Sequence, residues 1–399
     1  MRTFCSSAAV RITAAVVLWL VVAELGYGQL YHRVRHGVSY YELDRRNAAN
    51  RLYVEDPDVG YRSAPNLRRF ADTPSLPSAP RRHGAAVQTN EHGFRDDRAL
   101  PSPKAPGEIR VFALGDSTTY GLGRNRDTYP GRLQHLFADT PSVRIVNAGV
   151  PGYRSIHQVR LYATVIRALE PDVIIVNAGI GDFEAFVDRF WAPGDPSRHH
   201  FHVQIHTLSS PLSRLAIGEI VAHAYFSWRV ATDGREAGRT ADIRALRLRR
   251  FEAAARDRRW SDEVETNLQR LITLAKADGV LPVLMVGAMP QFAGASDDVK
   301  ALADRDLHMD GRWDAYVVAL DQLHARVRTL AARNAIPLID AQAVFARDIA
   351  DYRERLALFM DRVHPLEDGD RRVAAAMYPG LRAAVETVQK KRMRYPAKP

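Results

Sequence analysis

The stretch IRVFALGDS, residues 109–117, decides how this chain is organised. Ile109–Leu114 is a mostly apolar run of the kind that forms a buried strand, and Gly115 and Asp116 then make a turn. Ser117 therefore stands just beyond the carboxyl end of the predicted strand. In open α/β sheets this edge carries the chemistry.

Four further β-type runs alternate with helical patterns downstream of this strand. Such alternation is typical of a parallel sheet covered on both faces. We therefore expect a three-layer α/β/α sandwich with a five-stranded parallel sheet. The other strands are expected at Val143–Asn147, Val173–Asn177, Leu281–Val286 and Ile336–Ile339. Helices are expected at Tyr129–Phe137, Ile156–Ala168, Asp262–Ala277, Trp313–Arg333 and Asp370–Val388.

A serine at this edge needs help to act as a nucleophile. Its hydroxyl is weak unless an imidazole takes the proton, and a carboxylate usually orients that imidazole. Asp361 and His364 are three residues apart, between the last predicted strand and the last helix. One short loop at the same edge would carry both, so we predict that His364 faces Ser117 and that Asp361 orients His364.

Three blocks of sequence around these residues resemble the SGNH hydrolase superfamily, also called GDSL-type lipases and esterases. They are Val111–Gly121, Asn147–Ser155 and Asp361–Pro365. The segments at residues 89–95 and 127–130 also resemble exported bacterial relatives. The resemblance implies that Ser117 is the nucleophile, that the N–H groups of Ser117 and Gly152 form the oxyanion hole, and that no cofactor or metal is needed.

One block departs from the family pattern. The family has an asparagine that donates to the oxyanion, whereas this chain reads Gly179-Ile180-Gly181-Asp182, with Gly181 in that place. Losing one such donor costs on the order of 10²–10³ in rate if nothing replaces it. Asn177 lies nearby in sequence, but the pleat of a strand fixes its direction, so we expect it to bond locally.

The N-terminus carries an apolar run from Ile12 to Ala23, preceded by Arg2 and Arg11. Its length suits a signal peptide, or an uncleaved signal anchor if extended backward. A buried first helix of a soluble protein is the alternative. We expect residues 1–29 to be a signal peptide or anchor, which places the protein in the cell envelope, anchored in the inner membrane or periplasmic. Cys5 is the only cysteine, so no disulfide forms within the chain.

The remaining sequence suggests four further segments. Residues 30–105 are rich in proline and read as an extended arm with a small hairpin near residues 86–94. The hydrolase domain then spans 106–388, with an insertion at 183–260 that is either a lid or an appendage, and a basic tail at 389–399. Histidines in the insertion read as a solvated loop rather than a metal site, and its aromatic residues as packing. These are His199, His200, His202 and His206, with Trp191, Phe201, Tyr225, Phe226 and Trp228.

The net charge of +10 raises the question of an anionic partner. No nucleic-acid recognition motif accompanies that charge, so we expect no nucleic-acid partner. The basic stretch Arg244–Arg250 is read as a solvated helix face rather than a membrane-binding surface.

The residues together predict serine-dependent hydrolysis of carboxylic esters, of a small molecule or a glycan, through an acyl-enzyme. Two alternatives stay open. One is transfer or removal of acyl groups on cell-surface polysaccharide, and the other is a binding protein that keeps the fold without catalysis.

Overall fold

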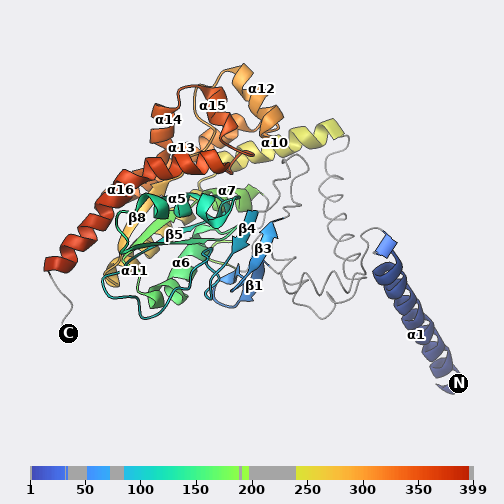
Figure 1. Cartoon of the computed structure of the whole chain (residues 1–399). Coiled ribbons are helices and arrows are strands. Elements are labelled where there is room, and N and C mark those ends of the chain that lie inside the picture. Colours follow the sequence, from blue (N-terminus) through green and yellow to red (C-terminus); the bar gives the residue numbers. More distant parts are fainter. Residues whose placement is uncertain are drawn as a thin grey trace. The chain divides into compact units, whose positions relative to one another are not determined.

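The computed structural model describes residues 2–31, 33–34, 52–71, 85–187, 191–196 and 240–394. The chain forms two compact units, Met1–Glu55 with Phe201–Arg244, and Asp56–His200 with Ala245–Pro399. The first unit contributes helix α1, Arg2–Leu25, which continues as the π-helical turn Gly26–Tyr31 (Figure 1). The second unit holds the sheet.

A five-stranded parallel sheet in the order β6-β5-β7-β8-β9 forms the centre of the second unit. This confirms the predicted fold class. The strands are β5 Ile109–Gly115, β6 Val143–Gly149, β7 Val173–Asn177, β8 Leu281–Val286 and β9 Leu338–Asp340. In register, Gly115 pairs with Gly149, and Leu114 pairs with Val176. The carboxyl ends of β6, β5 and β7 therefore meet at one edge of the sheet.

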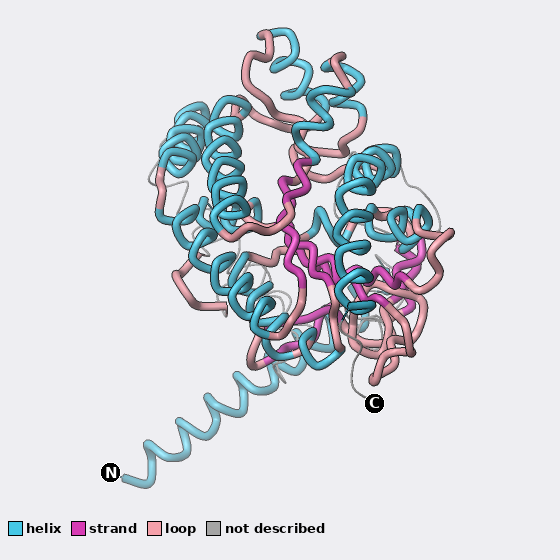
Figure 2. Tube along the Cα trace, turned by 90° about the vertical axis from the view of Figure 1, so that its left-hand side faces the viewer, coloured by secondary structure: helices cyan, strands magenta, loops and turns pink. Residues whose placement is uncertain are grey.

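Helices cover both faces of this sheet because its strands are apolar on both sides; every residue of β5 is buried. The packing places α5 Tyr129–Leu136, α14 Ala341–Asp348 and α16 Glu367–Arg394 on one face. On the other face lie α6 Ser155–Thr164, α11 Arg259–Ala277 and α13 Trp313–Arg333. Figure 2 shows the strands running between the two helical layers.

Several short helices were not predicted from the sequence patterns. They are α4 Ser117–Tyr120, α7 Ile180–Val187, α12 Asp297–Asp306 and α15 Tyr352–Ala357, in addition to α14. The described part of the insertion continues with α10 Thr240–Arg256. The segment predicted as a basic tail differs from that prediction, because α16 runs to Arg394 and Arg392 forms an ion pair with Asp172.

Of the segment predicted as an extended arm, the described residues 56–71 and 85–105 belong to the same compact unit as the sheet, which begins at Asp56 rather than at residue 106. Two ribbons form there, β1 Tyr53–Asp56 with β2 Gly60–Ser63, and β3 Arg68–Ala71 with β4 Ala85–Gln88. Instead of a hairpin at residues 86–94, β4 pairs with β3. Tyr61 is fully buried, and its hydroxyl donates to the carbonyl of Pro151 at 2.7 Å. The arm therefore supports a loop at the edge of the sheet.

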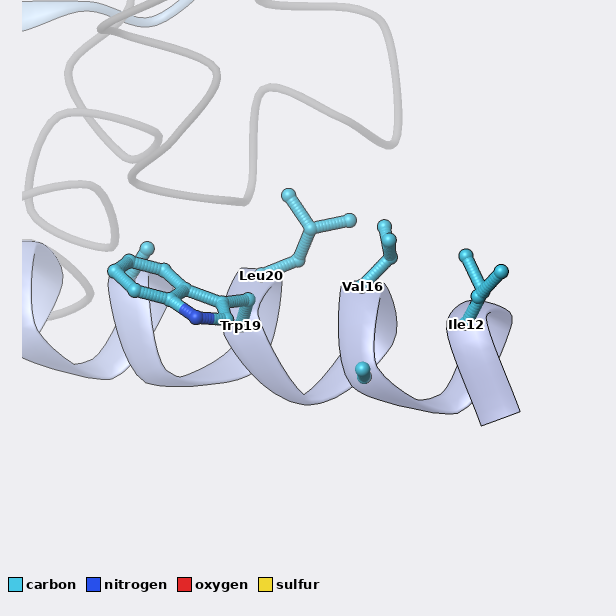
Figure 3. A pocket seen from close by; sticks show the side chains of 6 residues that line it. Ile12, Val16, Trp19 and Leu20 are labelled. Carbon is cyan, nitrogen blue, oxygen red and sulfur yellow. The ribbon is translucent and has the colours of Figure 1, made fainter. Parts of the chain in front are cut away.

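From Val10 onward, helix α1 presents exposed apolar side chains. Val10–Leu30 is long and apolar enough to cross a membrane, with a mean hydropathy of 1.7, and only 6% of that window is buried. A shallow apolar groove follows the helix surface, lined by Ile12, Ala15, Val16, Trp19, Leu20 and Ala23 (Figure 3). In water this surface would remain exposed, at a cost of about 25 cal/mol per Å² of apolar area.

Candidate active site

Ser117 is the first residue of α4, directly after β5. The turn between them is held by Asp116, whose Oδ1 accepts from the backbone N–H and from the hydroxyl of Thr118, both at 2.8 Å. An aspartate in this capping position satisfies N–H groups that have no partner within the helix. The strand and the cap together fix Ser117 at the carboxyl edge of the sheet, as the sequence predicted.

Asp361 and His364 lie in a tight turn between α15 and α16. The N–H groups of Val363 and His364 both donate to Asp361 Oδ1 at 2.9 Å, so the aspartate organises its own loop. Backbone bonds from Met360 N–H to His364 O at 2.9 Å and from Leu366 N–H to Leu358 O at 2.8 Å close the turn. The Asp-x-x-His spacing is therefore a local structural unit.

The turn brings His364 against Ser117 although 247 positions separate them in sequence. His364 Nε2 lies 2.7 Å from Ser117 Oγ, and His364 Nδ1 lies 2.8 Å from Asp361 Oδ2. A carboxylate only accepts hydrogen bonds, so Nδ1 carries the proton and Nε2 accepts from the serine hydroxyl. The three predicted residues form one chain of hydrogen bonds.

Asp361 and His364 each stabilise the charged form of the other. Burial alone would raise the pKa of Asp361, but the hydrogen bond from His364 and the two N–H donors outweigh it and hold the pKa well below its usual range. Burial lowers the pKa of His364, whereas the bond to Asp361 and the charges of Asp361, Glu184 and Asp116 together raise it above its ordinary value. Asp361 therefore stays ionised and stabilises a protonated imidazole.

The family resemblance assigns the oxyanion hole to two backbone N–H groups. Within the described residues, neither the N–H of Ser117 nor that of Gly152 has an acceptor. Gly152 has a φ of +76°, in the left-handed region that glycine adopts without strain, and this conformation shapes the turn after β6. The next residue, Tyr153, is buried, and its hydroxyl donates to Tyr61 O at 2.6 Å.

Gly181 lies at the start of α7, in surroundings that leave no room for a side chain. A Cβ at this position would lie 2.2 Å from the carbonyl oxygen of Tyr153. The neighbouring Asp182 is fully buried and accepts from the N–H and the hydroxyl of Ser155, both at 2.8 Å. Burial raises the pKa of Asp182 to about 7, against the opposing effects of Arg154 and Ser155. Asp182 therefore joins α7 to α6.

Asn177, which the sequence analysis expects to bond locally, instead bonds to a residue 59 positions away. Its Nδ2 donates to the hydroxyl of Thr118 at 3.1 Å. Most of the insertion residues singled out from the sequence, including the four histidines, lie outside the described residues. Trp191 and Asp195 are described, and Arg154 donates to the carbonyls of Ala192 and Asp195.

Three residues near His364 were not found from the sequence. Glu184 on α7, Tyr316 on α13 and Arg362 within the Asp361–His364 turn are joined by hydrogen bonds. Of the three, only Arg362 lies within a segment that the sequence analysis had singled out, between Asp361 and His364. No spacing rule connects it with residues 178 and 46 positions away.

Comparison with known proteins identifies the family of this chain. A sequence profile of the GDSL-like lipase/acylhydrolase family matches residues 113–372. The chain belongs to that family and is an SGNH-type esterase, an enzyme that hydrolyses ester bonds. A search of curated proteins gives no match to this chain.

Solved structures with a similar fold are distant in sequence. An acetyl xylan esterase is 16% identical, covers 68% of this chain and 98% of its own, and has a TM-score of 0.42. An acetylxylan esterase from Geobacillus stearothermophilus is 18% identical, with coverage of 68% and 94% and a TM-score of 0.40. An α/β hydrolase from a Lake Arreo metagenome is 19% identical, with coverage of 70% and 96% and a TM-score of 0.39. Similarities of this size do not assign a substrate.

Proposed function

We propose that the protein hydrolyses carboxylic esters through a covalent acyl intermediate on Ser117, with His364 as the general base and Asp361 as the residue that orients His364. The observation that carries this proposal is the continuous chain of hydrogen bonds from Ser117 Oγ through His364 to Asp361, at 2.7 and 2.8 Å. Such a chain activates a hydroxyl that is otherwise a weak nucleophile.

In the first half of the reaction, Ser117 Oγ attacks the ester carbonyl carbon while His364 Nε2 takes the hydroxyl proton. The N–H groups of Ser117 and Gly152 donate to the oxyanion that develops. The tetrahedral intermediate then collapses, and the alcohol leaves with the proton from His364. Water attacks the acyl-Ser117 in the second half, gives a proton to His364, and releases the acid as Ser117 regains its hydrogen.

Substitution of Ser117 tests this mechanism. We expect Ser117→Ala to abolish hydrolysis of p-nitrophenyl acetate by the purified chain. Ser142→Ala, at an exposed serine before β6, is the matched control and keeps full activity. Unchanged hydrolysis in Ser117→Ala would contradict the mechanism.

The same acyl-enzyme also permits transfer to a sugar hydroxyl, or removal of acetyl groups from a polysaccharide. Incubation with an acetyl donor and an added glycan distinguishes these outcomes. Hydrolysis releases acetate into water, whereas transfer leaves acetyl groups on the glycan. A binding protein without catalysis would do neither and would leave Ser117 unmodified.

We also propose that α1 holds the chain in a membrane, because the window from Val10 to Leu30 is apolar and largely exposed. Arginine in the middle of a membrane helix costs about 2.5–3.5 kcal/mol per residue. Val16→Arg with Leu20→Arg should move the chain from the membrane fraction to the soluble fraction. Val16→Leu with Leu20→Val is the control, and equal membrane association of both double variants would refute the anchor.

A further inference from the structure

The turn that carries Asp361 and His364 is held from outside by a small cluster. Arg362 Nε donates to the hydroxyl oxygen of Tyr316 at 2.6 Å and to Glu184 Oε1 at 3.1 Å. The Tyr316 hydroxyl donates to the same Glu184 oxygen at 3.0 Å. We call Glu184, Tyr316 and Arg362 the Glu184 cluster. One carboxylate oxygen is therefore the common acceptor for groups from α13 and from the turn.

The main chain of Arg362 is held as well. Gln291 Nε2 donates to its carbonyl oxygen at 2.7 Å, and Gln291 is almost fully buried. Arg362 is thus fixed through its side chain by α7 and α13 and through its backbone by the loop after β8. Arg362 lies between Asp361 and His364 in the same turn. A shift of Arg362 would therefore move the turn that carries both residues.

Glu184 also lies in α7, the helix that follows β7 at the edge of the sheet that carries Ser117. It follows Gly181 by three residues, so both lie on one face of the helix. Four carboxyl groups face His364: Asp361 in the same turn, Asp116 before α4, Glu184 on α7 and Asp370 on α16. After burial, which lowers it, and Asp361, which raises it, Glu184 is the next group that raises the pKa of His364.

We propose that Glu184 is a positioning residue for ester hydrolysis, which acts through Tyr316 and Arg362 to hold the Asp361–His364 turn against Ser117. The inference rests on the proposed function of Ser117. The side chains of Glu184 and Arg362 are 31% and 34% exposed, so water screens part of the attraction between their charges. Tyr316 is fully buried and supplies the rigid part of the cluster.

Two substitutions at Glu184 separate its hydrogen bonds from its charge. Glu184→Gln keeps an oxygen that accepts from Tyr316 and Arg362, whereas Glu184→Ala removes the acceptor. The measurement is the rate of inactivation of the full chain by a fluorophosphonate across pH, because this probe reacts with the activated serine whatever the natural substrate is. Melting temperature and circular dichroism establish that each variant is folded.

We expect Glu184→Gln to keep the plateau rate within about threefold, and Glu184→Ala to lose about 10- to 100-fold, as misplaced catalytic groups do. In Glu184→Gln the acid limb should move to lower pH, because His364 loses a charge that favours its protonated form. Glu354→Gln is the matched control, since Glu354 binds Arg372 on the surface at 3.0 Å and should change nothing.

Folded Glu184→Ala with the plateau rate and pH profile of the unaltered chain would overturn the inference, as would a Glu184→Gln profile that does not move. A lower melting temperature with an unchanged profile also overturns it, because it would show a purely structural role. Failure of the proposed function looks different, since the unaltered chain itself would then remain unlabelled at Ser117.

Discussion

Gly181→Asn would restore to this chain the side chain that its family uses as an oxyanion donor, yet we predict that it lowers activity. A Cβ at residue 181 would lie 2.2 Å from the carbonyl oxygen of Tyr153, more than 1 Å inside the 3.4 Å at which ordinary contact begins. The backbone carbonyl cannot rotate away as a flexible side chain can. Overpacking of this kind costs about 1–3 kcal/mol of stability.

The expected loss of rate follows from the contacts that hold Tyr153 in place. Its ring stacks on His157 with centroids 5.0 Å apart, and its hydroxyl is bonded to Tyr61 O, so the residue resists movement. Displacing its carbonyl disturbs the turn after β6, in which Tyr153 N–H donates to Val150 O at 3.1 Å and which also contains Gly152, whose N–H we propose as an oxyanion donor. A misplacement of about 1 Å in such a group costs on the order of 10²-fold.

Ester hydrolysis and fluorophosphonate labelling of Gly181→Asn and Gly181→Ala provide the test. Both variants carry the Cβ, and only the asparagine carries the amide, so the alanine variant isolates the steric effect. We expect both to be slower than the unaltered chain and to melt at lower temperature. An asparagine variant faster than the unaltered chain, by anything near the 10²–10³ of a regained donor, would refute the steric reasoning.

Other substitutions give equally definite outcomes. Asp361→Asn should keep the fold but lower the hydrolysis rate by about 10⁴, because an amide no longer fixes the tautomer of His364; a loss below tenfold in steady-state kinetics would contradict this. Burial raises the pKa of Asp370 to about 8, against the opposing effects of the Tyr129 N–H and Arg95. The folded chain then holds a proton that the unfolded chain releases, so the free energy of unfolding should fall as pH rises from about 4 to 8. Urea denaturation should show a smaller fall in Asp370→Asn, and parallel curves for the two proteins would refute it. Arg95→Met should cost about 3 kcal/mol, because the Arg95 guanidinium donates to the carbonyls of Tyr120 and Gly121 at 2.5 Å and to that of Gly123. Asn147 would still donate to Tyr120 O at 3.2 Å, whereas the carbonyls of Gly121 and Gly123 would lose this buried donor. Chemical denaturation measures this loss, and Arg305→Met on the exposed surface is the control.

The sheet was predictable because its strands are short apolar runs separated by helical periods. Val173–Asn177 and Leu281–Val286 have the bounds that the sequence indicated. The short helices were not predictable in this way. α7 and α14 are eight residues each, too short for a period to be distinguished from a loop. Their positions depend on tertiary contacts, such as the bond from Ser155 to Asp182.

The residues of the candidate site also differ in how far the sequence could predict them. Ser117, Asp361 and His364 were found because each belongs to a local motif, and Gly152 because it follows a recognisable block. Glu184 and Tyr316 carry no local signal, since their role depends on helices that meet only in the folded chain. The packing of residues 52–71 was also missed, because strands of four residues with turns between them resemble a linker.

The most direct test of the central claim is to label the folded, full-length chain with a fluorophosphonate and to map the modified residue by peptide mass spectrometry. The account predicts a single adduct on Ser117, which His364→Ala prevents. A folded chain that stays unlabelled, or an adduct on another serine that His364→Ala leaves intact, would contradict it.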